Sequence, residues 1–375
     1  MLLQLFTHLL QLFTIKMLPG NGHLISLLYR FIQSIKVMNI IYSLACLLVF
    51  QFLSCNQVTE FPQASQLPDS LENQKRDKTG TANMVFRSAD SGQTWQDISD
   101  GLPKPVKDDN GGGRNVFFAD ENGLWLTDGN GIYHSKPNFS DPFWTKAFIP
   151  DEHSSIAPGK NGIFAFHYLS GIFQKSIGTS VWSPVFTDFQ DKRVRGVLET
   201  AGGTIFISSD SGLFKSTDRG KTWKALPAGG LGGKLVESNG VLLTTGGQGI
   251  MRSTDNGDNW YWVIKEGGVG IDVAQINGGF AAITYSSASN TRRVRTSYDG
   301  GKAWQPIDAG LPAQLSISSI IQVGEYFFCG HPDGIFRSSD KGKTWKLLLP
   351  SIEGKVFKLS VSGNVIYAIP RNAGC

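Results

Sequence analysis

Four features are scarce in this 375-residue sequence: an excess of one charge, closely spaced histidines, cysteine, and long apolar runs. Lysine and arginine number 35 against 31 aspartates and glutamates, and this net charge of +4 is too small to favour nucleic acid as a partner. The six histidines are scattered without the spacing of metal ligands. The sequence therefore predicts no nucleic-acid partner, no metal site and no cofactor.

Cysteine occurs at only four positions, and two of these fall in the N-terminal segment. The other two, Cys329 and Cys375, lie in neighbouring repeats near the end of the chain. They could pair in an oxidising compartment, or they could be one buried thiol and one terminal thiol. The sequence leaves both alternatives open.

The main apolar run, from Ile40 to Ser54, is shorter than the roughly 20 residues that a helix needs to span a bilayer. Such a run fits the apolar region of a secretory signal. It ends in Phe52-Leu53-Ser54-Cys55, which resembles a bacterial lipobox with Cys55 as the lipidated first residue of the mature protein. The alternative is ordinary cleavage nearby, with Cys55 as an unmodified thiol.

Residues 1–55 are thus predicted to be a lipoprotein-type leader, and they place the protein in the bacterial cell envelope with a lipid anchor in the membrane. Met17 and Met38 are alternative starts, so residues 1–37 are either a long n-region or a wrongly assigned beginning. Residues 56–82 are polar and have too little hydrophobicity for a core of their own. We expect them to form a disordered tether.

From residue 83 onward one pattern recurs, Ser-x-Asp-x-Gly-x-Thr-Trp, and such self-similarity indicates a repeat architecture. Five copies begin at Ser88, Ser216, Ser253, Ser297 and Ser338. Asn259 and Ala303 replace the threonine in the third and fourth copies.

Each copy is typical of a strand, a turn and a second strand. Segments such as Gly334-Ile335-Phe336-Arg337 combine apolar residues with a polar one, which is typical of a partly buried strand. The aspartate can accept hydrogen bonds from the amides of its turn, and the glycine supplies a positive φ. The tryptophan should place its ring between neighbouring sheets, where a buried ring contributes about 4–6 kcal/mol.

This pattern resembles the Asp-box (BNR) repeat of sialidase-like and sortilin-like β-propellers, which also occurs in photosystem assembly factors. We call each eight-residue copy an Asp-box. The motif is shared by enzymes, receptors and assembly factors, so the resemblance implies a fold and no particular activity. It implies structural roles for Asp90 and Trp95, Asp218 and Trp223, Asp255 and Trp260, Asp299 and Trp304, and Asp340 and Trp345.

Two weaker copies lead to Trp144 and Trp182, which brings the tryptophans at this position to seven. Their successive separations are 49, 38, 41, 37, 44 and 41 residues. A four-stranded propeller blade takes about 40–50 residues. We therefore predict an all-β fold over residues 83–370, a seven-bladed β-propeller of four-stranded antiparallel blades.

Each repeat has an inner hairpin followed by the outer hairpin that carries the Asp-box. The ends are offset, because residues 84–98 supply only an outer hairpin and residues 355–369 only an inner one. We expect these two halves to pair in one blade, which closes the ring and removes its open edges.

Strand alternation predicts that the Asp-boxes lie on one face of the ring and the connections between blades on the other. Propellers usually bind over the central channel on that second face. Asp272 stands apart from the other candidates because it lies on an innermost strand, where a structural hydrogen-bonding role is its first interpretation. The candidate binding residues are Arg114, Asp151, Glu152, His153, Arg193, Arg195, Asp272, Arg292 and Arg293.

Three functions fit this organisation. The preferred one is a lipid-anchored envelope protein that uses the propeller to bind a glycan or a protein. The resemblance also implies a sialidase-like exo-glycoside hydrolase, but the Arg-Ile-Pro motif of that family is absent, so we assign no catalytic residue and favour a protein that is not an enzyme. The third is an assembly factor for an envelope protein complex. The oligomeric state is not readable from the sequence.

Overall fold

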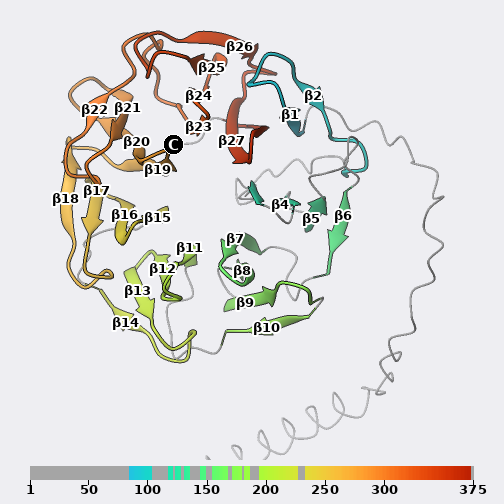
Figure 1. Cartoon of the computed structure of the whole chain (residues 1–375), viewed down its shortest axis with the longest axis vertical. Coiled ribbons are helices and arrows are strands. Elements are labelled where there is room, and N and C mark those ends of the chain that lie inside the picture. Colours follow the sequence, from blue (N-terminus) through green and yellow to red (C-terminus); the bar gives the residue numbers. More distant parts are fainter. Residues whose placement is uncertain are drawn as a thin grey trace, which may run out of the picture. The chain divides into compact units, whose positions relative to one another are not determined.

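The computed structural model describes residues 84–103, 117–120, 123–127, 131–135, 144–148, 154–167, 171–179, 181–185, 194–226 and 233–372. These residues form strands and turns, arranged as seven sheets of four antiparallel strands. Within them no helix is long and apolar enough to cross a membrane. Figure 1 shows the sheets set around a ring, so the prediction of an all-β, seven-bladed propeller is confirmed.

Blades 1 to 3 follow one another along the chain, and each runs from its innermost to its outermost strand. Blade 1 is β3 (Phe117–Asp120), β4 (Gly123–Thr127), β5 (Ile132–Ser135) and β6 (Thr145–Ala147). Blade 2 is β7 (Ser155–Gly159), β8 (Gly162–His167), β9 (Gly171–Ser176) and β10 (Trp182–Pro184). Blade 3 is β11 (Val194–Glu199), β12 (Ile205–Ser209), β13 (Gly212–Ser216) and β14 (Lys224–Ala225).

The second half of the ring follows the same order. Blade 4 is β15 (Leu235–Ser238), β16 (Val241–Gly246), β17 (Gly249–Ser253) and β18 (Tyr261–Lys265). Blade 5 is β19 (Gly270–Ile276), β20 (Gly279–Ser286), β21 (Thr291–Ser297) and β22 (Gln305–Pro306). Blade 6 is β23 (Ser319–Val323), β24 (Tyr326–His331), β25 (Gly334–Ser338) and β26 (Lys346–Pro350).

Blade 7 joins the two ends of the propeller, as the offset of the repeats predicts. It consists of β27 (Val356–Ser362), β28 (Val365–Arg371), β1 (Phe86–Ser88) and β2 (Gln96–Asp97). β1 is antiparallel to β28, with Phe86 opposite Ala368. Figure 1 shows β1 and β2 beside β27. The ring is therefore closed by hydrogen bonds between strands from opposite ends of the propeller.

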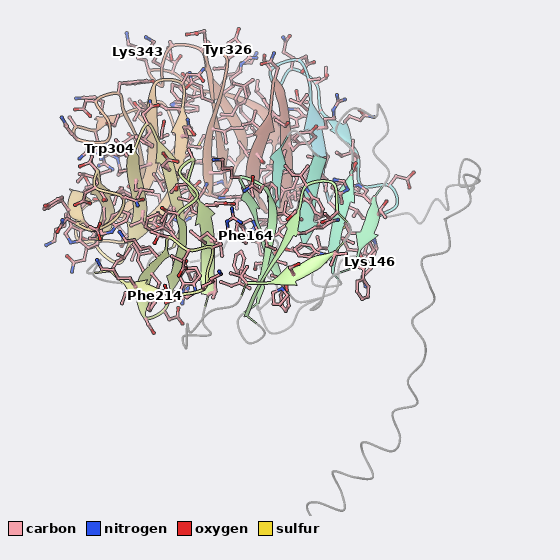
Figure 2. The ribbon with its side chains drawn as sticks, turned by 60° about the horizontal axis from the view of Figure 1, so that its bottom comes forward. Lys146, Phe164, Phe214, Trp304, Tyr326 and Lys343 are labelled. Atoms are coloured by element: carbon pink, nitrogen blue, oxygen red, sulfur yellow. The ribbon has the colours of Figure 1, made fainter. Side chains whose placement is uncertain are left out.

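The core is divided into seven apolar clusters, one between each pair of neighbouring blades. Phe164 of β8, for example, is fully buried between blades 2 and 3 and lies toward the inside of the ring in Figure 2. Each of the seven repeat tryptophans belongs to the cluster between its own blade and the preceding one. This placement confirms the predicted position of the rings.

The depth of these rings differs from the prediction. Only Trp144 and Trp260, each 9% exposed, are buried, and the other five are partly exposed. The reason is that each tryptophan stands at the outer rim of its blade: Trp182 is the first residue of the outermost strand β10, and the other six directly precede theirs. The figure of about 4–6 kcal/mol is therefore an upper limit for most of them.

Within the Asp-box the turn is built as predicted and has one further feature. In the last copy, Asp340 accepts hydrogen bonds from Ser338 Oγ at 2.8 Å, from the Thr344 amide at 2.9 Å and from Thr344 Oγ1 at 2.6 Å. Gly342 has a φ of +84°, and Lys341 before it also has a positive φ, +61°. The turn thus needs two successive left-handed residues, and only the second is glycine in most copies.

The alternation of strands gives the ring two different faces. One, the Asp-box face, carries the Asp-boxes together with the turns inside the inner hairpins. The other, which we call the connection face, carries the links between blades and the turns between the second and third strands. Its described parts include Lys234, residues 286–291 and residues 308–318.

Candidate functional site

Five of the candidate binding residues, and the lipidation site, lie outside the described residues. They are Arg114, Asp151, Glu152, His153, Arg193 and Cys55. Their roles remain predictions. The other four candidates, Arg195, Asp272, Arg292 and Arg293, are described, and they do not converge on a single place.

Arg195 stands at an irregularity in the innermost strand of blade 3. The register of β11 against β12 shifts between Val194 and Gly196, so Arg195 is the extra residue of a β-bulge. Its guanidinium Nε forms an ion pair with Oδ1 of Asp210, in the turn after β12. The side chain keeps 36% of its surface exposed, so it belongs to the accessible part of the connection face.

Arg292 and Arg293 are held by partners within the fold. Arg292 is buried, and its Nη1 donates to the Ile317 carbonyl at 2.8 Å. Arg293 forms a two-pronged contact with Asp308, at 2.7 and 3.2 Å, and this hydrogen bonding raises the pKa of the guanidinium. These contacts link β21 to the segment that leads from blade 5 into blade 6, which indicates a structural role.

Asp272 lies at the centre of a polar cluster built from four successive blades. Its carboxylate is 2% exposed, and Lys234 Nζ lies 2.8 Å from Oδ1. Lys358 Nζ lies 3.4 Å from Oδ2 and 3.4 Å from the Ser318 carbonyl. The three side chains come from blades 4, 5 and 7, and Ser318 belongs to the segment that enters blade 6.

The strand register explains why these residues meet. Lys234, Asp272, Ser319 and Lys358 occupy the same place in four inner hairpins. Each lies four residues before the last residue of the first strand, which is Ser238, Ile276, Val323 or Ser362. Because the innermost strands β15, β19, β23 and β27 are adjacent in the ring, equal positions form one layer around its axis (Figure 1). We call this the polar layer: Lys234, Asp272, Ser319 and Lys358.

The polar layer lies at the connection-face end of the ring, because its residues stand at or near the starts of the innermost strands. Ser319 fixes two blades to each other there. Its Oγ accepts a hydrogen bond from the Leu359 amide at 3.0 Å and donates to the Phe357 carbonyl at 3.1 Å. Ser319 therefore fixes this part of the layer to the backbone of blade 7.

Charge in the layer is unbalanced in favour of the cations. Arg371, at the end of β28, is a third cation near the layer. Burial lowers the pKa of Arg371 and the Asp272 carboxylate opposes that shift, while the charge of Arg371 contributes to lowering the pKa of Lys358. Burial lowers the pKa of Lys358 to about 8, with Lys234 and Arg371 adding to the shift and Asp272 opposing it. Burial alone would raise the pKa of Asp272, but the two ammonium groups outweigh it and hold the pKa below its usual value.

The connection face also carries exposed hydroxyl and amide groups outside the polar layer. The turn between β20 and β21 exposes Ser287, Ser289 and Asn290, and Tyr285 Oη donates to Asn290 Oδ1 at 2.7 Å. The segment after β22 adds the partly exposed Gln314 and Ser316. Such groups can bind either an extended polar ligand or water.

Neither metal nor thiol chemistry is assembled among the described residues. They contain no group of three or more histidine, cysteine, aspartate or glutamate side chains that could hold a metal ion. Cys329 is buried and forms no disulfide with any described residue, and burial raises the pKa of its thiol well above the usual range. Cys375 lies outside the described residues, so a pairing of the two stays an open alternative.

Of the polar layer, sequence reasoning singled out Asp272 and missed Lys234, Ser319, Lys358 and, beside the layer, Arg371. A signal for them was available. Aligning the inner hairpins by their turns places a polar residue at the same position in four consecutive repeats. Single lysines on a chain with 35 basic residues do not stand out without that alignment.

Comparison with known proteins identifies the architecture. The sequence matches no family model and no curated protein. Solved structures do resemble it: the GH74 xyloglucanase from Xanthomonas campestris has a TM-score of 0.57 at 16% identity, over 73% of this chain and 52% of that one. A virginiamycin B lyase from Staphylococcus aureus, solved with quinupristin, has a TM-score of 0.54 at 14% identity, over 70% and 97%.

What these proteins share with this chain is the β-propeller fold. At such identities the likeness shows no more than that, and the chain spans about half the length of the xyloglucanase. The extracellular domain of a putative one-component system from B. thetaiotaomicron is also similar, with a TM-score of 0.49 at 13% identity over 69% of this chain and 41% of that one.

Proposed function

We propose that this protein is a glycan-binding module of the bacterial cell envelope. A lipid on Cys55 anchors it, residues 56–82 tether it, and the connection face of the propeller holds the ligand over the polar layer. The observation that carries the proposal is the polar layer itself, in which four consecutive blades direct polar side chains to one end of the ring axis.

The difference in polar groups between the two faces supports placing the ligand on the connection face. The Asp-box aspartates have their oxygens occupied by hydrogen bonds from their own turns, as at Asp218, which accepts from Ser216 and twice from Thr222. The carboxylates of that face therefore stabilise their own turns and have few acceptor sites left for a ligand. The connection face combines charged groups at its centre with exposed hydroxyl and amide groups around them, which suits a ligand that carries many hydroxyls.

A glycan array probed with the mature protein tests the proposal. We expect saturable binding to a subset of glycans, and loss of that binding in a Lys234→Met, Lys358→Met double variant. A pulldown from envelope extract tests the competing hypothesis of an assembly factor. A stable, stoichiometric protein partner without any glycan binding would assign the protein to complex assembly. Turnover of a fluorogenic sialoside that Arg195→Ala abolishes would assign it to hydrolysis.

The anchor has its own test. We expect mass spectrometry of the mature protein to find a lipid-modified Cys55 at its N-terminus. Cys55→Ser should move the protein from the membrane fraction to the soluble fraction, and an unmodified Cys55 in the mature protein would contradict the anchoring.

A further inference from the structure

We propose that the polar layer recognises the carboxylate of an acidic sugar, with Lys358 and Lys234 as its direct partners and Asp272 as the group that positions them. This inference rests on the proposed function, because it specifies which glycans the connection face selects.

Lys358 has bonding capacity that its surroundings leave unfilled. An ammonium group offers three donors, and the two oxygens near Lys358 Nζ, from Asp272 and Ser318, both lie at 3.4 Å, beyond the 2.7–2.9 Å typical of a charge-assisted hydrogen bond. Its side chain is 23% exposed, which leaves part of it open to solvent. Lys234, at 44% exposure, is more open and lies 2.8 Å from the same carboxylate.

The sign of the missing group follows from the charges that face one another. Lys234 on blade 4 and Lys358 and Arg371 on blade 7 are all cationic, and Asp272 on blade 5 is the carboxylate that faces them. Three cations around one carboxylate leave an excess of positive charge in a partly buried place, which is costly without a counter-ion. An anion bound there relieves the repulsion among the cations.

Asp272 cannot take the ligand itself, because its side chain is 2% exposed and both of its oxygens face lysines. It acts by holding the two ammonium groups toward each other at the axis. The hydroxyl and amide groups of residues 286–291 and 314–318 lie on the same face and can form hydrogen bonds with the hydroxyls of a saccharide.

Calorimetric titration with a galacturonic acid trisaccharide, compared with its neutral methyl ester, tests the inference at pH 7. We expect the acid to bind at least tenfold more tightly than the ester. Lys358→Met and Lys234→Met should each weaken binding of the acid by roughly tenfold to a hundredfold, the range for losing a hydrogen bond to a charged group. Lys343→Met is the matched control, because it removes the same charge from an exposed Asp-box residue at the outer edge of the ring (Figure 2).

Two further readouts separate recognition from a merely structural role. Asp272→Asn removes the group that holds the two ammonium groups in place and that opposes the lowering of the Lys358 pKa, so the folded variant should bind the acid more weakly than the wild type and should lose affinity at a lower pH. Affinity of the wild type should fall between pH 7 and pH 9, because Lys358 loses its charge near pH 8 while the sugar carboxylate stays ionised. Lys358→Met should lack that fall.

Equal binding of acid and ester, or unchanged binding by Lys358→Met, would overturn the inference. If the glycan array shows binding to neutral glycans only, the proposed function survives and the acidic specificity is wrong. If a glutamate tripeptide binds as tightly as the trisaccharide, the carboxylate site belongs to a protein partner, and the glycan assignment is wrong as well.

Discussion

The Asp-boxes and the polar layer both depend on aspartates whose pKa lies below the usual value, but the physical causes differ. In the boxes of Asp340 and Asp90, hydrogen bonds from the side chain and the amide of Thr344 or Thr94 lower the pKa of the carboxyl group to about 2. In the polar layer, burial works against ionisation of Asp272, and two lysines overcome it. The box carboxylate needs only its own turn, whereas Asp272 needs partners from two other blades.

This difference separates a structural repeat from a specific site. A carboxylate that is satisfied by residues two to four positions along the chain can be copied into every blade without changing its neighbours. A carboxylate that is satisfied by Lys234 and Lys358 depends on one particular arrangement of the ring. The repeated aspartates therefore hold their own turns, and the single one, which depends on the arrangement of the ring, is the candidate for a specific site.

The largest effect should come from breaking the polar layer. Asp272→Asn removes the negative charge and leaves Lys358, which is 23% exposed, and the more open Lys234 without their carboxylate partner, which should lower the free energy of unfolding by about 3–4 kcal/mol. Chemical denaturation at pH 7 measures this. Asp340→Asn is the matched change in an exposed Asp-box and should cost clearly less, and equal losses would show that Asp272 is no more than another turn aspartate.

A somewhat smaller effect should follow from filling the space at an Asp-box glycine. Gly342 has a φ of +84°, and a Cβ there would lie 2.3 Å from Cβ of Ile307 in the preceding blade. Gly342→Ala should cost about 2–4 kcal/mol, the sum of left-handed strain and overpacking. Gly363→Ala is the control, because its φ is +55° with no atom within 4 Å, so it should show the conformational cost alone.

The sequence was sufficient to predict the ring because each blade carries its own signal. The seven tryptophans mark seven outer hairpins, and the half-repeats at the two ends predict the pairing of β1 with β28. The left-handed conformation of Arg219 and Lys341 was not predictable, because neither is a residue that favours it. It follows from the closing of the turn by the aspartate hydrogen bonds.

The polar layer was only partly predictable, for a different reason. Asp272 drew attention as a carboxylate on an innermost strand, but its partners lie 38 residues before it and 86 after it, at Lys234 and Lys358. Contacts between such positions depend on the register of three hairpins at once. A single bulge, such as the one between Gly270 and Asp272, changes the direction of every side chain beyond it.

Low pH should lower the melting temperature through the Asp-box aspartates. Their aspartates are more acidic in the folded protein than the usual value of 3.8, so they stabilise the fold above about pH 4 and lose this contribution as the pH falls toward 2. We expect the melting temperature to decrease over that window. Asp340→Asn should show a shallower decrease, because the substituted side chain does not titrate, and parallel curves would contradict the assignment.

The smallest effect should come from a substitution that the protein already contains. Ala303 fills the threonine position of the fourth Asp-box, where Asp299 still accepts the backbone amide at 3.0 Å. Thr344→Ala should therefore lose only the hydrogen bond from Oγ1 to Asp340, at about 0.5–1 kcal/mol, and Ala303→Thr should gain a similar amount. Paired denaturation curves measure both changes. A loss in Thr344→Ala as large as that of Gly342→Ala would mean that the side-chain bond, and not the backbone conformation, holds the turn.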